Sequence, residues 1–393
     1  MFMRLIYQHI PDWMWPIVCN VRRMLGTGKR ASVAPSIPTY SLPDNLATAP
    51  VSDHSIDSNL SVPTSAQDAA YAAKIAAERA IFDDQADIHE LPAIFHYWSN
   101  KYLRPMLEEY GFSNPDQFFV KYLAEAVNRT GSAKPKFLSV GSGNCDTEVR
   151  LAVQLKQMGI INFSFECLEL SPLMLARGRA DAHVQDVAEH MIFTLSDFNF
   201  WEAAHSYDAV IANQSLHHIM KLEHLFDAIK RALLPAGLFM TSDMIGRNGH
   251  MRWPESLAVV HHFWQELPES YRYNRQLRRH EASYNNWDCS SEGFEGIRAQ
   301  DVLPELIKRF NFKLFIAASS VVDLFIDRGF GHHFDVTKTW DLEFVDRLHA
   351  YDEQALLSGE LTPTRMLAVM TLTDEPGQFS RGLMPENCVR HAQ

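Results

Sequence analysis

In the middle of the chain, short continuous apolar runs alternate with segments in which apolar residues recur every three or four positions. Short apolar runs, typical of buried strands, lie near 136–140, 162–168, 191–195, 207–212 and 237–243. Apolar residues at a spacing of three or four positions predict helices near 146–158, 172–182, 220–233 and 301–310. Alternating strands and helices imply parallel strands joined by right-handed crossovers. The pattern therefore predicts a doubly wound α/β fold.

The end of this pattern differs from its middle. A further strand is predicted near 312–319, and the final apolar run is Met366–Thr371. Because no helix is predicted before this run within reach of a normal crossover, we expect it to be an antiparallel last strand. The sheet domain should then span 136–375, with a flexible tail at 376–393.

The region before the sheet divides near residue 66. Residues 31–66 are rich in Ser, Pro, Ala and Asp, which predicts a disordered linker. From residue 67 to 135 the composition and spacing favour helices, notably over His89–Gly111 and Pro115–Asn128. We expect these helices to form an N-terminal extension that caps the sheet domain.

The first 25 residues contain Trp13, Trp15 and several aliphatic residues, but prolines and polar residues interrupt them. The segment is too short and broken for a membrane span, and it lacks the order of a signal peptide. We expect it to pack on the body or fray, within an N-terminal unit of residues 1–66. Weak contact with a membrane or a partner is the alternative.

Two insertions depart from the core pattern. Residues 246–300 are rich in Trp, Tyr, His and Arg, and residues 323–360 contain the sequence FGHHFD. Ligands of open α/β sheets bind beyond the carboxyl ends of the strands, and the first insertion leaves the fifth strand at that edge. We therefore expect 246–300 to form a helical insertion after the fifth strand and to carry substrate-binding residues.

Composition narrows the class of protein. The chain has 393 residues, 46% of them hydrophobic and 21% charged, as in an ordinary globular protein. A formal net charge of −12 argues against broad nucleic-acid binding. The five cysteines show no CxxC or metal-ligand spacing. This cysteine usage indicates a reducing, cytoplasmic environment, and no metal site is expected.

Chemistry-bearing residues end three of the predicted strands. Gly141 and Gly143 follow the first strand, where a missing Cβ allows a tight turn against a ligand. Glu169 ends the second strand, where its carboxylate suits both hydroxyls of a ribose. Asp197 and Phe198 end the third, with an acceptor for an adenine amino group and a ring for its face. Together these strand ends predict a nucleoside-binding site.

Asp146 discriminates between nucleoside cofactors. It occupies the position where the dinucleotide fingerprint has a third glycine. A carboxylate on the first helical turn suits the positive helix end, but it would repel a pyrophosphate there. A zwitterionic, sulfonium-bearing ligand without phosphates fits better.

At this point the chain resembles the class I S-adenosylmethionine-dependent methyltransferases, which have a Rossmann-like sheet. The matching segments are VGSGNCD, CLELSP, SDF, YDAVIANQSLHHI and LLPAGLFMTSD, in the family's order. The family usually has an acidic residue where this chain has Ser139, and a third glycine where it has Cys145. Asp146 is a candidate for the missing carboxylate. The resemblance implies S-adenosyl-L-methionine as cofactor, bound by Gly141, Gly143, Asp146, Glu169, Asp197, Phe198 and Asn213.

The reaction itself needs a base only if the acceptor must lose a proton. His250 follows the fifth strand closely and is our candidate base, with His332 and His333 as weaker ones. We assign the pair His217 and His218 to packing and the start of a helix. Arg252 and Trp253 are the candidate acceptor-binding residues, since a guanidinium and an aromatic ring can orient a hydroxyl-rich acceptor.

We therefore expect a methyltransferase acting on a small-molecule or glycan-like acceptor. Oxygen is the favoured atom, because the chain reads NQSL after the fourth strand and lacks the nitrogen-methyltransferase signature there. Two alternatives stay open. One is a catalytically silent methyltransferase fold that serves as a binding or scaffold subunit, and the other is a dinucleotide-dependent oxidoreductase.

Overall fold

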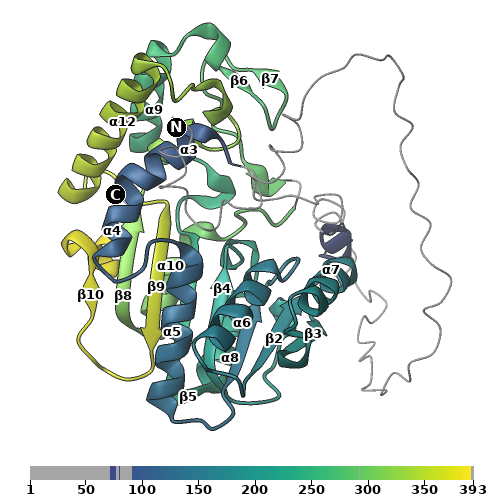
Figure 1. Cartoon of the computed structure of the whole chain (residues 1–393). Helices are drawn as coiled ribbons and strands as arrows, with labels where there is room; N and C mark the ends of the chain where they lie inside the picture. Colours follow the sequence, from purple (N-terminus) through teal and green to yellow (C-terminus); the bar gives the residue numbers. More distant parts are fainter. Residues whose placement is uncertain (1–70, 77–78, 80–90, 292, 391–393) are drawn as a thin grey trace, which may run out of the picture. The chain divides into compact units, whose positions relative to one another are not determined.

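The computed structural model describes residues 71–76, 79, 91–291 and 293–390, which belong to one compact unit. Its main sheet has eight strands in the order β10-β8-β9-β5-β4-β1-β2-β3 (Figure 1). The strands are β1 (Lys136–Val140), β2 (Ser164–Glu169), β3 (Met191–Leu195), β4 (Tyr207–Asn213), β5 (Leu233–Met244), β8 (Asn311–Ala318), β9 (Arg365–Thr371) and β10 (Gln378–Phe379).

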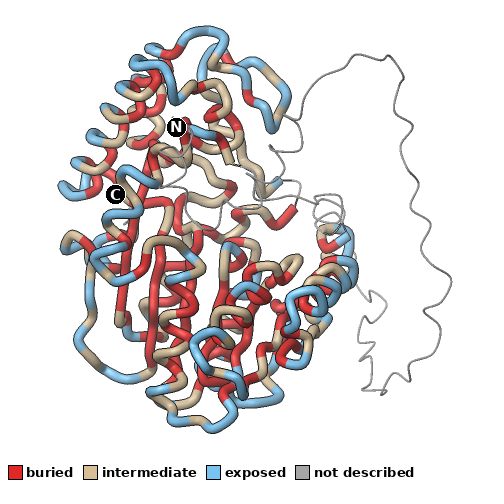
Figure 2. Tube along the Cα trace, viewed as in Figure 1, coloured by how far each residue is buried: buried red, intermediate tan, exposed pale blue. Residues whose placement is uncertain are grey.

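The sheet has the predicted α/β character. Strand β9 runs antiparallel to both of its neighbours, β5 and β8, and the other strand pairs are parallel. This confirms the prediction of a mostly parallel sheet with an antiparallel strand near its end. Figure 2 shows the strands as the most continuously buried part of the chain. Buried strands of this kind explain the unbroken apolar runs in the sequence.

Two layers of helices cover the two faces of the sheet. On one face lie α5 (Pro115–Thr130), α6 (Asp146–Gln157) and α7 (Pro172–Val184). On the other lie α8 (Leu222–Ala232) and α10 (Ala299–Ile307). Neighbouring strand residues serve opposite faces, because Phe137 packs in the first core and Leu138 in the second.

Local signals explain where these helices begin. Asn114 and Ser171 cap α5 and α7 by accepting hydrogen bonds from the backbone N–H of Gln117 and Met174, respectively. In both helices a proline occupies the first position, where no hydrogen-bond donor is needed. The predicted bounds of these helices consequently agree closely with the observed ones.

A third core lies outside the sheet and is made mainly by helices. It is built by α3 (Ala93–Trp98), α9 (Pro254–Glu266), α11 (Val322–Ile326) and α12 (Thr339–Ser358). Helix α3 continues through the π-helical turn η3 (Ser99–Leu103) into α4 (Arg104–Glu108). The N-terminal helices thus divide, since α3 joins this helical layer whereas α5 packs on the sheet.

The insertions supply most of this helical layer. Residues 246–300 contribute α9 and a short hairpin of β6 (Tyr273–Asn274) and β7 (Arg279–His280), and 323–360 contribute α12. The helical character of 246–300 was predicted and is confirmed by α9, whereas its hairpin and the helix of 323–360 were not predicted. Their apolar residues face other helices at irregular spacing rather than a flat sheet, which weakens the periodic signal.

The predicted flexible tail is wrong for most of its length. Strand β10 pairs with β8, and Cys388 is buried in a sheet core. A short strand of two residues carries too little periodicity to be recognised from sequence. The predictions for residues 1–66 fall outside the described residues.

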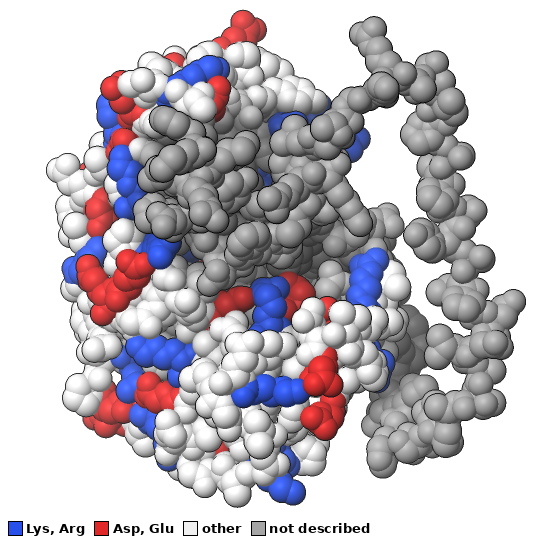
Figure 3. Space-filling view, viewed as in Figure 1, with Lys and Arg blue, Asp and Glu red and all other residues white. Residues whose placement is uncertain are grey.

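The surface gives two further observations. On the face shown in Figure 3, the described Lys and Arg side chains are interspersed with Asp and Glu, so that no extended basic area forms there. Within the part of the chain that the structure describes, no helix combines the length and apolarity that a membrane span requires.

Candidate active site

The glycine turn between β1 and α6 is held tightly at both ends. Gly141 has a φ of +71°, and a Cβ there would lie 2.6 Å from the Cβ of Ser215. The backbone N–H groups of Gly141 and Ser142 both donate to the carbonyl oxygen of Leu168. The turn is therefore clamped between the ends of β4 and β2, as a ligand-binding turn at a sheet edge must be.

The third position of the turn is adapted to carry Cys145. This residue has a φ of +58°, a conformation that favours glycine. Helix α7 passes against it at Gly178, where a Cβ would lie 2.7 Å from the Cβ of Cys145 and 2.8 Å from the carbonyl oxygen of Asn144. A glycine on the opposing helix therefore provides the space that a glycine in the turn would otherwise give.

The acidic residue that the family motif usually has at position 139 is supplied from a helix. Ser139 donates to Oε1 of Glu148, an α6 residue, at 2.7 Å. Burial raises the pKa of Glu148 to about 7, against the lowering effect of the Ser139 hydrogen bond. Its other oxygen, Oε2, is buried with no hydrogen-bond partner among the described residues. Glu148, rather than Asp146, brings a carboxyl group to this place.

Asp146 has a different environment. It stands at the first position of α6 and forms an ion pair with Arg150 at 2.7 Å. Its cofactor contact stays a prediction, although its place at the helix N-terminus agrees with the argument against a pyrophosphate.

Glu169 is held by three backbone hydrogen bonds, one of which comes from the glycine turn. Its Oε2 accepts from the backbone N–H of Gly143 at 2.9 Å. Its Oε1 accepts from the N–H groups of Leu170 and Ser171 at 2.8 and 3.0 Å. Burial raises the pKa of Glu169, and these three hydrogen bonds oppose the rise. The carboxylate is thus fixed at the end of β2, in direct contact with the turn that it was predicted to serve.

Asp197 is engaged by a residue of the N-terminal helical segment 71–76. The Tyr71 hydroxyl donates to its two carboxylate oxygens at 2.9 and 2.7 Å. The Tyr71 ring contacts those of Phe200 and Phe294 with centroids 6.0 and 5.8 Å apart. Burial and the carboxylate together raise the pKa of Tyr71. The predicted adenine acceptor therefore already has a donor from outside the sheet domain.

The other two predicted cofactor residues have simpler surroundings. Phe198 is buried in the sheet core, and a Cβ on Gly141 would lie 3.9 Å from its ring. Asn213 is the last residue of β4 and is partly buried. Both lie at the correct edge of the sheet, and their contacts with a cofactor stay predictions.

A second group of polar residues begins immediately after β4. His217 lies in a 3-10 turn, Leu216–His218, and its Nδ1 is 2.6 Å from Oδ1 of Asp243 on β5. Asp243 Oδ2 also accepts from the backbone N–H of Ser215 and Leu216, at 3.0 and 2.8 Å. One buried carboxylate therefore sets both the turn and the orientation of the His217 ring.

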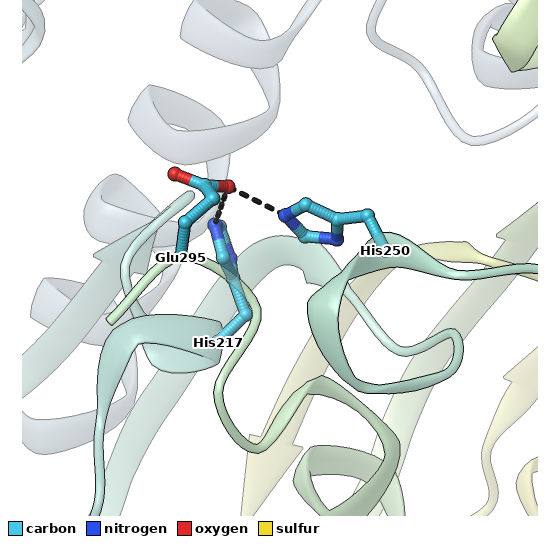
Figure 4. A group of neighbouring side chains, drawn as sticks. All are labelled: His217, His250 and Glu295. Atoms are coloured by element: carbon cyan, nitrogen blue, oxygen red, sulfur yellow. Dashed lines mark hydrogen bonds and ion pairs between the residues drawn. The ribbon is translucent and has the colours of Figure 1, made fainter. Parts of the chain in front are cut away.

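Glu295 connects this pair to the predicted base. Its Oε1 lies 2.5 Å from Nε2 of His250 and 3.3 Å from Nε2 of His217 (Figure 4). Its Oε2 lies 3.5 Å from Nε2 of His218. Figure 4 shows the two imidazole rings approaching the carboxylate from different segments. We call His217, His250 and Glu295, with Asp243 behind them, the histidine–carboxylate cluster.

The charges in the cluster follow from its burial. Burial by itself would lower the pKa of His217, but Asp243 and Glu295 outweigh it and raise that pKa to about 10. The neighbouring histidines lower the pKa of Glu295 against the effect of burial. Burial lowers the pKa of His250, although its bond to Glu295 opposes the change. At neutral pH, His217 is thus an imidazolium, Glu295 a carboxylate and His250 a neutral imidazole.

These protonation states determine which nitrogen of His250 is basic. With Glu295 ionised, the single ring proton of His250 belongs on Nε2, where it is donated to Oε1. The lone pair is then on Nδ1, for which the described residues offer no hydrogen bond. A neutral histidine oriented by a carboxylate through one nitrogen, with the other nitrogen available, is the arrangement of a general base.

The structure separates the three residues that we expected to act together after β5. Only His250 reaches the cluster. Arg252 is buried and forms an ion pair with Asp323 of α11 at 3.0 Å. Trp253 lines a cavity of about 170 Å³ together with Arg390 and lies against that guanidinium, whose carbon is 4.6 Å from its ring centroid. These contacts indicate that both residues anchor the insertion, whereas their predicted contacts with an acceptor stay predictions.

The remaining histidine candidate has a separate position. His333 lies in the turn η10 (Gly331–His333), and its Nε2 contacts the carbonyl oxygen of Tyr273 at 2.7 Å. His332 belongs to the same turn. Neither is part of the histidine–carboxylate cluster.

Four residues with functional contacts were missed or misjudged from the sequence: Glu148, His217, Asp243 and Glu295. Of these, His217 and Asp243 carried a usable signal, because both directly follow or end predicted strands at the ligand edge. Glu148 and Glu295 carried none, since one looks like an ordinary helix residue and the other lies in an irregular loop.

The residues at the glycine turn fit S-adenosylmethionine. A Cβ on Gly143 would meet only Met174 Cε, at 3.5 Å, among the described residues, so the turn presents bare backbone to a ligand. Glu169 lies beside that backbone for the ribose. The unpartnered Oε2 of Glu148 places a carboxyl oxygen behind the turn, where it can accept a hydrogen bond from the ammonium group of the ligand.

Comparison with known proteins agrees with this geometry. Residues 138–239 match a sequence family described as "Methyltransferase domain". No curated protein matches the chain in sequence. The matched segment extends from β1 to β5 and includes the glycine turn, Glu169, Asp197 and His217.

Solved structures are also similar at low sequence identity. The geranyl diphosphate C-methyltransferase from Streptomyces coelicolor A3(2) has 12% identity and a TM-score of 0.42, covering 76% of this chain and 98% of its own. The O-methyltransferase of a Brevibacillus brevis polyketide synthase has 10% identity and a TM-score of 0.37, covering 77% and 85%. The [4+2]-cyclase SpnF has 14% identity and a TM-score of 0.38, covering 79% and 96%.

Proposed function

We propose that this chain is a class I S-adenosylmethionine-dependent methyltransferase, as the methyltransferase-domain match of residues 138–239 supports, and that it methylates a hydroxyl oxygen of a small-molecule acceptor with His250 as the base. The observation that carries the proposal is the Glu295–His250 contact of 2.5 Å at the ligand edge of the sheet. A base held in this way is needed for an oxygen acceptor, which must lose a proton to become a good nucleophile.

The location of the cluster supports this role. His217 follows Ser215 by two residues, and Ser215 itself touches the glycine turn at Gly141. His218 is also among the groups that oppose the rise in the pKa of Glu169, so the two groups of residues lie close together. A cofactor on the glycine turn would therefore extend toward the histidine–carboxylate cluster.

S-adenosylmethionine, when bound, supplies a methyl group attached to a positively charged sulfur, and this sulfur is the leaving group when the acceptor oxygen takes the methyl group. In this chain, Nδ1 of His250 takes the acceptor's proton as the oxygen–carbon bond forms. Glu295 keeps its hydrogen bond to Nε2 and stabilises the resulting imidazolium. The His217 imidazolium, held by Asp243, fixes Glu295 in turn.

The acceptor class follows from the same residues. A cluster with a base suits hydroxyl-bearing acceptors, including sugar-like ones, more than amines that are already nucleophilic. The loops of 246–300 carry both His250 and Glu295, so we assign acceptor selection to this insertion. Arg252 and Trp253 hold this insertion against other segments of the protein.

The main reason for considering a catalytically silent fold no longer applies. It rested on Ser139 and Cys145, which depart from the family motif. Glu148 supplies a carboxyl group beside Ser139, and Gly178 makes room for Cys145. Compensation at both positions is what we expect of a turn that still binds its cofactor.

The test is a transfer screen with methyl-labelled S-adenosylmethionine against metabolite extracts, using His250→Asn as the matched variant. Asparagine tolerates the left-handed backbone of residue 250, where φ is +54°, better than alanine. We expect the variant to lose roughly 10²–10⁴-fold in rate while its cofactor affinity, measured by calorimetry, stays unchanged. His333→Gln is the control and should keep full activity.

Two outcomes would contradict the proposal. One is a fully active His250→Asn enzyme on the true acceptor. The other is a methylated product whose new bond, located by mass spectrometry and NMR, is to nitrogen.

A further inference from the structure

The histidine–carboxylate cluster has a second chemical property besides proton transfer. The ligand atoms of His217, His250 and Glu295 all lie within 4.8 Å of one another. They come from three segments that are distant in sequence, namely the turn after β4, the turn after β5 and the loop before α10. Two imidazole nitrogens and one carboxylate oxygen facing a common point form a donor set for a divalent transition metal.

Asp243 gives the cluster a feature typical of metal sites. It binds Nδ1 of His217 at 2.6 Å, which leaves Nε2 directed at Glu295. A carboxylate on the far nitrogen fixes the tautomer and makes the ligating nitrogen more basic, as in carboxylate–histidine–zinc arrangements. His217 and Asp243 are both buried, so this half of the site is rigid.

The other half of the site can adjust to an ion. Tetrahedral zinc with bonds of about 2.0–2.1 Å needs ligand atoms roughly 3.3–3.5 Å apart. The His217–Glu295 separation of 3.3 Å already meets this, whereas the His250–Glu295 separation of 2.5 Å must open. The Glu295 side chain is 40% exposed, so it can shift and also gives the ion a route from solvent.

We propose that His217, His250 and Glu295 bind a zinc-type divalent ion, and that this ion blocks methyl transfer. Binding of the ion releases the Nε2 proton of the His217 imidazolium to solvent. With the metal on Nε2 of His250, the one proton of that neutral ring moves to Nδ1. The lone pair that would accept the acceptor's proton is then lost. The metal-binding part stands on the cluster alone, and the inhibitory part rests on the proposed function.

The binding test uses the full chain after treatment with a chelator, without cofactor or acceptor. Cobalt(II) serves as a spectroscopic probe, and zinc chloride is titrated by calorimetry. We expect one ion per chain and the visible absorption of tetrahedral cobalt, which zinc should displace. Glu295→Gln should lose this signal, and it is preferable to His217→Gln because its side chain is partly exposed and less important for folding.

The control must account for the 18 histidines of the chain, which can bind metal adventitiously. His333→Gln removes a histidine outside the cluster and should keep the cobalt spectrum. An unchanged spectrum in Glu295→Gln would overturn the site, as would a chain that binds no ion at stoichiometric concentration.

The inhibition test adds zinc during methyl transfer to the true acceptor. We expect activity to fall as the site fills, with the same midpoint as the calorimetric titration, and to return with a chelator. Activity that is unchanged or increased at full occupancy would overturn the inhibitory part. A chain that binds zinc but transfers no methyl group in any extract overturns the proposed function and leaves the metal site supported.

Discussion

One imidazolium lies between two carboxylates at the ends of β4 and β5. His217 bridges Asp243 and Glu295, and His250 adds a neutral ring to the same carboxylate. Glu295 thus brings negative charge to the ligand edge of the sheet, which suits a neighbouring sulfonium. At the scale of single residues, the position of each proton decides what the site can do.

The rate should report the protonation of His250. Because burial lowers its pKa below the ordinary 6.5, the base is already unprotonated at pH 7. We expect kcat/KM to be flat near neutrality and to fall tenfold per pH unit only below the lowered pKa. In Glu295→Gln the hydrogen bond that opposes this shift is weakened, so the acid limb should move to still lower pH. An acid limb above pH 7 would exclude His250 as the base.

Glu169 should control cofactor affinity. Its carboxylate is predicted to accept both ribose hydroxyls while it holds the N–H of Gly143. Glu169→Ala should lose roughly 1.5–3 kcal/mol of binding, which is about 10- to 150-fold in Kd. Calorimetry on variants with native circular dichroism is the measurement. Equal affinity in a folded Glu169→Ala protein would remove the ribose assignment.

At the scale of elements, the packing of α7 on the glycine turn is the tightest constraint on the cofactor site. The helix touches the turn through Gly178, and the turn carries Cys145 in a left-handed conformation. A Cβ at position 178 would clash with the Cβ of Cys145, so Gly178 is required as long as residue 145 carries a side chain. The helix and the turn must therefore be considered together.

A double-mutant cycle tests this coupling. Gly178→Ala places a methyl group 2.7 Å from the Cβ of Cys145, so it should displace the turn and weaken cofactor binding at least tenfold. Adding Cys145→Gly removes that clash, and we expect partial recovery. Recovery should be incomplete because the carbonyl oxygen of Asn144 stays 2.8 Å away. Purely additive effects would contradict the coupling.

The helical segment 71–76 gives a second prediction at this scale. The Tyr71 hydroxyl occupies the Asp197 carboxylate that the adenine amino group is predicted to use. Tyr71→Phe frees Oδ2 of the carboxylate, whereas Oδ1 still accepts from Asn199. The substitution keeps the ring against Phe200 and Phe294. We therefore expect tighter cofactor binding, by up to about tenfold. Weaker binding in Tyr71→Phe would instead show that the hydroxyl forms part of the adenine site.

At the scale of the whole molecule, three hydrophobic cores determine where the residues of the site lie. Two cores cover the faces of the sheet, and the third joins the helices α3, α9, α11 and α12. The ion pair of Arg252 with Asp323 ties the first insertion to this third core. The loops that carry His250 and Glu295 thus belong to an insertion that is attached both to the sheet and to the third core. This attachment holds His250, the proposed base, in place.

Buried acids should make global stability depend on pH. The pKa of Glu148 is about 7 in the folded chain against 4.5 in the unfolded one. Between these values the folded state holds a proton that the unfolded state has released, so stability falls as pH rises. At about 1.4 kcal/mol per unit, the loss is about 3 kcal/mol at most. Urea unfolding of Glu148→Gln at pH 5 and pH 8 should show a smaller difference than the natural chain.

The control for this measurement is Glu189→Gln, which changes a carboxylate with 77% of its side chain exposed. It should keep the pH dependence of the natural chain. Asp352 is also buried with a pKa raised to about 7, so Glu148→Gln should reduce the dependence without abolishing it. An identical dependence in Glu148→Gln and the natural chain would contradict the assignment.

Much of this protein follows from its sequence. The strands from β1 to β5, the antiparallel β9, the glycine turn and Glu169 at the end of β2 were all predicted at or near their observed positions. These features depend on short-range causes, namely the period of apolar residues, the capping of helices and the conformational freedom of Gly141. Such causes act within a few residues and therefore leave a readable pattern.

The tertiary structure alone decided how the site is completed. His250 and Glu295 are 45 residues apart, and nothing local to either shows that they meet. The same holds for Ser139 with Glu148. Contacts with distant segments also gave Arg252 and Trp253 an anchoring role, and they showed that most of the predicted flexible tail is ordered. Such pairings arise when insertions fold onto the sheet and bury polar groups, which must then find partners wherever the packing brings them.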